Sequence, residues 1–96
     1  MIIWSATAES DLLHLEEFLS ARYAMADKLI YRILSAVETL EDFPLVGRKG
    51  RVSGTRELVI SDTPYLVSYR HYDDDIQILA VLHGARRWPK NFNMPR

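Results

Sequence analysis

Apolar residues recur at helical spacing through the first half of the chain. They fall three or four residues apart, as on the buried face of a helix: Ala8, Leu12, Leu15, Leu19, Tyr23, Ala26, Ile30, Ile33, Val37 and Leu40. One helix over residues 6–43 would be roughly 55 Å long, whereas a domain of this size has a radius of gyration of about 12 Å. The pattern therefore predicts two antiparallel helices, with the break at Arg22–Ala24.

The ends of the helical region carry their own signals. Ser5 is a good N-cap, and Glu9 and Asp11 follow where negative charge suits the helix dipole. Proline disfavours helical geometry in the residue before it, so Phe43–Pro44 is expected to end the second helix. Residues 44–55 are then predicted as a loop, because they combine one proline and three glycines with basic residues.

Segments rich in β-branched and aromatic residues occur at the N-terminus and after the loop. They are predicted as strands over Met1–Trp4, Thr55–Ser61, Tyr65–Tyr72 and Ile76–His83. The turns at Asp62–Pro64 and Asp73–Asp75 are so short that the last three strands must be antiparallel neighbours. Leu79 and Val81, on the second face of the last strand, predict a central strand that is partly covered on both sides.

These elements together predict an α+β fold in the order β-α-α-β-β-β. An N-terminal strand precedes an antiparallel helical hairpin and a three-stranded antiparallel β meander, in a single domain over residues 1–96. A chain of 96 residues with 48% hydrophobic residues suits one modest core. No cysteine occurs, which favours a reducing, cytoplasmic location. Apolar runs are too short to span a membrane, and the N-terminus does not resemble a signal peptide.

The net charge of −1 hides an asymmetry between the two halves of the chain. Residues 1–47 hold eight acids and three bases, whereas residues 48–96 hold nine bases and five acids. This division predicts two faces with different partners. The alternative is that the charges are scattered over a solvated surface.

The sequence contains no phosphate-binding loop, nucleophile elbow or metal-ligand spacing, so neither a cofactor nor a metal is expected. Asp73–Asp75 is interpreted as a solvated turn, and His14 as a surface or boundary residue of a helix. Arg56 and Arg70 lie on predicted strands, where each must reach water or a partner. We expect Arg70 to pair with Glu57 or with an aspartate of the turn.

The segment His83-Gly84-Ala85-Arg86-Arg87-Trp88-Pro89, where the last strand ends, is the main candidate site. Its glycine permits a sharp turn, and its arginines present charged forks suited to phosphates or carboxylates. The histidine can exchange a proton near neutral pH, and the tryptophan offers a stacking face. If His83 and Arg86 converge in space with the strand residues Arg56 and Arg70, the four together would form a positive patch. The alternative is a C-terminal cap whose tryptophan packs on the edge of the core.

Five fragments of the chain match a known pattern in order and spacing. They are Ser5–Leu12, Phe43–Arg48, Arg56–Val59, Pro64–Arg70 and Ile78–Trp88. Together they resemble the ParE/RelE superfamily of bacterial type II toxins, over nearly the whole chain. The resemblance implies a helical hairpin on a small antiparallel sheet, in agreement with the fold predicted above. It also implies a cognate antitoxin partner, whose C-terminal segment wraps the toxin.

The resemblance implies either of two activities. RelE-like members cut mRNA in the ribosomal A site with basic residues and a C-terminal tyrosine, whereas ParE-like members inhibit DNA gyrase. The basic residues of the ribonuclease pattern match Arg56 and Arg86 but otherwise fall on Leu58 and Leu66, and its tyrosine falls on or near Phe92. A charged phosphodiester transition state needs several donors at once. These losses, and the pattern His-Gly-Ala-Arg-x-Trp, favour the ParE branch.

The favoured function is a non-enzymatic toxin that inhibits DNA gyrase and is neutralised by an antitoxin. The expected target-binding residues are Arg70, His83, Arg86, Arg87 and Trp88. The hairpin has more leucines than one buried stripe requires, so an antitoxin segment is expected to cover some of them. The expected antitoxin-binding residues are Leu12, Leu13, Leu19, Leu29 and Leu34.

Two alternatives stay open. The first is a ribosome-dependent mRNA endonuclease, for which acid–base and phosphate chemistry would fall to four residues: Arg56, Arg70, His83 and Arg86. The second is an inactive binding module with the toxin fold.

Overall fold

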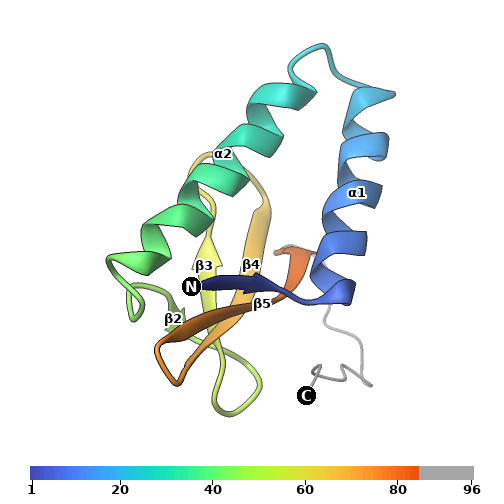
Figure 1. Cartoon of the computed structure of the whole chain (residues 1–96). Coiled ribbons are helices and arrows are strands. Elements are labelled where there is room, and N and C mark those ends of the chain that lie inside the picture. Colours follow the sequence, from blue (N-terminus) through green and yellow to red (C-terminus); the bar gives the residue numbers. More distant parts are fainter. Residues whose placement is uncertain (85–96) are drawn as a thin grey trace.

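Two helices pack on one face of a five-stranded sheet in the computed structural model, which describes residues 1–84 (Figure 1). The strand order is β1-β5-β4-β3-β2. The elements are β1 (Ile2–Trp4), α1 (Ala6–Ser20), α2 (Ala26–Glu38), a 3₁₀ turn (Thr39–Glu41), β2 (Arg48–Lys49), β3 (Arg56–Val59), β4 (Tyr65–Tyr72) and β5 (Asp75–His83). The predicted α+β fold with a helical hairpin and an antiparallel meander is confirmed.

The helical hairpin forms as its sequence signals indicate. The Oγ atom of Ser5 accepts a hydrogen bond from the Ala8 amide at 3.0 Å, so Ser5 is the N-cap of α1. Residues 21–25 separate the two helices, and the predicted break lies within this segment. The 3₁₀ turn follows α2 and ends just before the Phe43–Pro44 pair. The break is therefore confirmed, whereas α2 ends at Glu38, five residues before the predicted Phe43.

β5 is an internal strand, because β1 and β4 pair with its two edges, and β4 is the middle strand of the five. β1 runs parallel to β5 and β4 runs antiparallel to it. A bulge interrupts the β4–β5 ladder, since Tyr69 pairs with Ile78 and Ser68 with Ala80. The extra residue shifts the alternation, and Val81 joins the core beneath the helices. The expectation that Val81 shares the second face with Leu79 was therefore wrong.

The loop predicted for residues 44–55 contains a strand that the sequence did not reveal. β2 is only two residues long and pairs with β3 through Arg48 opposite Glu57 and Lys49 opposite Arg56. The hairpin between β4 and β5 is also tighter than predicted. Asp73 and Asp74 have φ of 52° and 67° and form its turn, whereas Asp75 belongs to β5.

The core lies between the helices and the sheet. It contains apolar side chains from both helices and from the central strands, among them Leu19, Ile33, Val37, Val67, Tyr69 and Ile78. Beyond β1, the outer edge of β5 is covered by the start of α1. There the Ser5 hydroxyl donates to the Leu79 carbonyl at 3.2 Å. Within residues 1–84, no helix is long and apolar enough to cross a membrane.

Candidate functional site

The end of β5 places His83 against Tyr65, its partner on β4. The two rings meet edge to face, with centroids 5.5 Å apart. The Gly84 amide donates to the Pro64 carbonyl at 2.6 Å, and a Cβ atom on Gly84 would lie 3.2 Å from that oxygen. β5 ends at His83, before Gly84, as predicted, and the missing Cβ atom of Gly84 permits this close approach to Pro64. The other predicted members of this site, Arg86, Arg87 and Trp88, lie outside the described residues.

A cavity of about 550 Å³ opens beside His83, between α1 and the ends of β4 and β5. Aromatic and titratable side chains line it, including Asp11, His14, Phe18 and Tyr65. α1 and β5 contribute to the lining although they lie far apart in the chain. The sequence placed His14 on the helix surface, and its Nδ1 atom lies 3.3 Å from the Ser10 hydroxyl.

Asp11 joins this cavity to the sheet. Its Oδ2 atom accepts a hydrogen bond from the Val81 amide at 3.0 Å and so satisfies part of the outer edge of β5. Burial raises the pKa of Asp11 above its ordinary value, and the Val81 amide and the charge of His14 offset part of that effect. The carboxylate therefore fixes α1 on β5 at a cost in desolvation.

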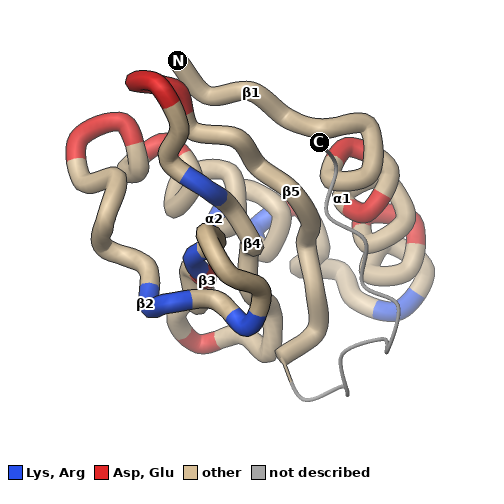
Figure 2. The backbone as a smooth tube through the Cα atoms, turned by 90° about the horizontal axis from the view of Figure 1, so that it is seen from below, with Lys and Arg blue, Asp and Glu red and all other residues tan. Residues whose placement is uncertain are grey.

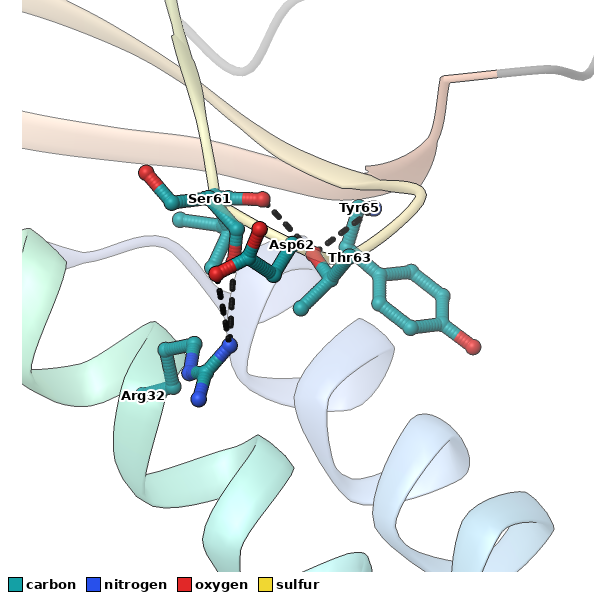
Figure 3. A network of polar contacts seen from close by, with 6 residues as sticks. Arg32, Ser61, Asp62, Thr63 and Tyr65 are labelled. Atoms are coloured by element: carbon teal, nitrogen blue, oxygen red, sulfur yellow. Dashed lines mark hydrogen bonds and ion pairs between the residues drawn. The ribbon is translucent and has the colours of Figure 1, made fainter.

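The turn before Tyr65 is held on α2 by a polar network (Figure 3). Arg32 donates to the Ser61 carbonyl at 3.2 Å and lies 3.7 Å from the carboxylate of Asp62. The Thr63 hydroxyl then accepts a hydrogen bond from the Tyr65 amide at 3.1 Å. These contacts fix the entry into β4 and hence the ring that contacts His83.

Arg70 is not part of the site at the end of β5. It donates from Nε to the Oε1 atom of Gln77, and its guanidinium lies 5.3 Å from the ring centre of Tyr72. The predicted partner Glu57 is engaged elsewhere. Arg70 pairs in register with Gln77, so six residues of β5, or roughly 20 Å, separate that position from His83. The expected convergence of Arg70 and His83 was therefore wrong.

Arg56 is used to brace the loop before it. Its Nη1 atom donates to the carbonyls of Leu45 and Gly47, at 3.3 and 2.8 Å. Arg56 pairs with Tyr69, the residue adjacent to Arg70, so the two arginines project from opposite faces of the sheet. The four-base patch predicted from the sequence therefore fails for its three described members, because strand register keeps them apart.

A second basic region, which the sequence did not mark as a site, lies on residues 44–56, here called the basic loop. Figure 2 shows Lys and Arg gathered on β2 and the neighbouring strands, whereas α1 carries Asp and Glu. Glu57 is only 5% exposed and accepts hydrogen bonds from Arg48 Nε at 3.1 Å and from the Arg51 amide at 3.2 Å. A buried carboxylate thus holds the basic loop on β3. Three cations within four residues, Arg48 to Arg51, were the signal available in the sequence.

The leucines expected to bind an antitoxin differ in exposure. Leu13 and Leu34 are 61% and 38% exposed on the helical hairpin. Leu12 and Leu29 are half-buried against the core. Leu19 is 2% exposed and belongs to the core, so it cannot contribute to a surface. The physical reason is that Leu19 ends the inward stripe of α1, whereas Leu13 lies off that stripe.

The described residues define a small α+β protein with a helical hairpin packed on a five-stranded sheet. A helical hairpin covers one face of the sheet, and within residues 1–84 no group of histidines and carboxylates that could hold a metal ion is assembled. The chain matches, over residues 2–88, the family described as the ParE toxin of the type II toxin–antitoxin system parDE. The chain therefore belongs to the ParE toxin family.

Two relatives agree with this family. The first is a Sinorhizobium fredii (strain NBRC 101917 / NGR234) protein provisionally named toxin Y4kP. It is 43% identical over 65 residues, which cover 68% of this chain and 67% of that protein. The second is a solved structure of the chromosomal ParDE TA system from P. aeruginosa. It superposes with a TM-score of 0.78 at 24% identity, over 85% of this chain and 92% of that one, and it shows the shared fold.

Proposed function

We propose that this ParE-family toxin arrests growth in the cytoplasm by binding and inhibiting DNA gyrase, and that a cognate antitoxin neutralises it. The observation that carries the proposal is that the basic residues needed for RNA cleavage are partly replaced by leucine and otherwise lie far apart. Leu58 and Leu66 occupy two positions where the ribonuclease pattern has bases, and Leu66 is 3% exposed. Apolar side chains there cannot stabilise a phosphodiester transition state.

The remaining bases support the same conclusion. The Nη1 atom of Arg56 is occupied by two loop carbonyls. Arg70 lies on β4 opposite Gln77, six residues along β5 from His83. An acid, a base and phosphate donors must act together within hydrogen-bond reach of the reacting atoms. Among the described residues, no lysine or arginine lines the cavity beside His83, which supports binding of a target rather than cutting.

We place the gyrase contact at the end of β5, where His83 begins the segment that continues to Arg86, Arg87 and Trp88. The edge-to-face contact with Tyr65 and the Gly84 turn give this segment a rigid point of departure. Arg70 leaves the proposed contact set because of its distance along the strand. Arginine and tryptophan are the residues that most often dominate the binding energy of protein interfaces.

We place the antitoxin on the outer surface of the helical hairpin. Leu13 and Leu34 are exposed there, together with Phe18 and Tyr31, which are 44% and 72% exposed. A hollow of about 650 Å³ between α2 and β1 is lined by Leu34 and Trp4, among others. An apolar segment of a partner would bury these side chains, which water now contacts.

The test separates the two activities in one experiment. The chain is expressed without antitoxin, and plasmid supercoiling and mRNA integrity are followed over the same interval. Purified chain is then added to purified gyrase or to translating ribosomes. We expect loss of supercoiling by gyrase while mRNA stays intact. Cleavage of mRNA on ribosomes, lost in His83→Ala, would instead identify a ribonuclease.

Variants locate the contact. Arg86→Ala combined with Trp88→Ala is expected to abolish growth arrest and gyrase inhibition while binding to the antitoxin persists. Lys28→Ala, an exposed change on α2, is the matched control and should keep full toxicity. Growth arrest that survives the double change would refute the proposed site at the end of β5.

A further inference from the structure

The basic loop encloses a second hollow, of about 390 Å³, on the side of the sheet where β2 and β3 pair. Its lining includes Lys49, Arg56 and His71 together with Gly50 and residues 52–55. We propose that this hollow is a phosphate-binding site. The proposal goes beyond gyrase inhibition and does not depend on it, because the end of β5 contributes nothing to this lining.

The loop around the hollow is held rigidly by its own hydrogen bonds. The Gly50 amide donates to the Thr55 carbonyl at 2.8 Å, and the Thr55 amide and hydroxyl both donate to the Val52 carbonyl, at 3.1 and 2.6 Å. Gly54 has φ of 84°, as the third residue of a type II turn requires. Residues 50–55 therefore present fixed backbone groups to a ligand, with little conformational freedom to lose on binding.

The base of the same loop is fixed from inside the protein. The buried Tyr69 hydroxyl donates to the Pro44 carbonyl and accepts from the Gly47 amide, each at 2.9 Å. A Cβ atom on Gly47 would lie 2.7 Å from the Tyr69 ring, so the loop follows the tyrosine closely. Glu57 anchors Arg48 on the far side. Three hydrogen bonds made by Tyr69 and Glu57 thus fix the base of this short surface loop.

The charge at the hollow is positive and uncompensated. The carboxylate of Glu57 is the acid nearest in sequence to the loop, and Arg48 pairs with it. Lys49, Arg56 and His71 form no ion pair within residues 1–84. Arg56 uses Nη1 for the loop carbonyls, and its Nε and Nη2 atoms make no hydrogen bond in the described part of the chain. Donors are therefore available without displacing any structural contact.

The donor set fits a phosphate better than a carboxylate. An ammonium, a guanidinium and an imidazole from three different strands border one hollow, and the amides of Val52, Ser53 and Gly54 donate to no other group within residues 1–84. A phosphate group carries enough acceptor oxygens to engage several of these donors at once. A carboxylate has only two oxygens and would leave donors unmatched. The phosphate can belong to a polynucleotide backbone or to a free nucleotide, and the chemistry recognised is the same.

The experiment measures binding to the intact chain in complex-free form at low ionic strength. Three probes are titrated separately: inorganic phosphate, ATP without magnesium and a short oligo-dT strand. Backbone amide signals of Lys49, Val52, Ser53, Gly54 and His71 are followed by NMR. We expect these signals to shift together and saturably with phosphate. The oligonucleotide and ATP arms then identify the source, since the better-bound of the two carries the natural phosphate.

Two variants test the assignment. Lys49→Gln and His71→Gln remove donors but leave the Arg56, Glu57 and Tyr69 braces intact, and Lys49→Gln is expected to weaken phosphate binding about tenfold. For the oligonucleotide, loss of one phosphate contact should also reduce the slope of log affinity against log salt by roughly 0.7. Lys28→Gln on α2 removes the same charge far from the loop and should change neither quantity.

The contrary results are equally definite. Phosphate shifts spread over the whole basic surface without saturation, or equal affinities in Lys49→Gln and Lys28→Gln, would overturn the site. Gyrase inhibition is measured on the same variants. Its persistence in Lys49→Gln is expected, so failure of the phosphate site and failure of the proposed function are distinguishable.

Discussion

Replacing Tyr69 with Phe is expected to destabilise the protein by about 2 kcal/mol. The change removes a hydroxyl that makes two hydrogen bonds of 2.9 Å, and each such bond contributes roughly 0.5–1.5 kcal/mol. The two ends differ in what they lose. Pro44 is partly exposed, so its carbonyl can bond to water, whereas Gly47 is buried and its amide would be left without a partner. The loss of unfolding free energy is therefore expected near the middle of the range for two hydrogen bonds, about 1–3 kcal/mol, rather than at its lower end.

Urea unfolding followed by circular dichroism measures this change. For a domain of this size, 2 kcal/mol corresponds to a fall in Tm of about 8–16 °C. Tyr31→Phe is the matched control, because Tyr31 is 72% exposed and makes no side-chain hydrogen bond within residues 1–84. It should stay within about 0.5 kcal/mol of the wild type. A Tyr69→Phe protein as stable as the control would refute the view that this hydroxyl holds the basic loop.

The same pair of proteins has a pH signature. Burial raises the pKa of Tyr69 above its ordinary value of 10.0, and the Gly47 amide and the charge of Arg56 offset part of that effect. The contribution of Tyr69 is therefore complete below that value and is lost as pH rises through the folded-state pKa. The deficit of Tyr69→Phe should shrink above pH 10, and a deficit that grows there would contradict the assigned cause.

Two further changes test the carboxylates of Asp11, which is half-buried, and Glu57, which is buried. Asp11→Asn should gain stability relative to the wild type as pH rises from below 3.8 towards neutrality, because burial raises the pKa of Asp11 and the wild type must desolvate a charge there. The unfolding free energies of both proteins are measured at pH 3 and pH 7. An opposite trend would contradict this cause. Glu57→Gln should lower the free energy of unfolding by about 1–3 kcal/mol, because Arg48 and the Arg51 amide would lose a charged acceptor. The exposed change Glu38→Gln should lower it little. Equal urea midpoints for the two variants would refute the anchoring role of Glu57.

Helix periodicity and strand composition were sufficient to predict most of the fold. The stripe from Ala8 to Leu40 defines two helices, because one helix of that length cannot fit a domain of this size. β2 could not be predicted, since two residues carry no periodic signal and its pairing depends on the buried Glu57. The bulge beside Tyr69 was equally hidden, because an alternating sequence gives no sign of where one residue leaves the ladder.

The candidate site was predicted less well, and the reason is register. Residue chemistry identified His83 and its glycine turn, which depend only on neighbouring residues. Whether Arg56, Arg70 and His83 lie close together depends instead on the register between neighbouring strands. The separation of Arg70 from His83 follows from the pairing of Arg70 with Gln77 and of Tyr65 with His83. Side-chain type could not supply them.

The parallel pairing of β1 with β5 also has a consequence for how the chain is made. The Ser5 hydroxyl bonds the Leu79 carbonyl across 74 positions of sequence, so the N-terminal strand has no partner until β5 has been synthesised. At about 5–20 residues per second, this interval is roughly 4–15 s of translation. The helical hairpin emerges early in that period, but its inner face has no sheet to cover. The sheet of this toxin can therefore be completed only after β5 has been synthesised.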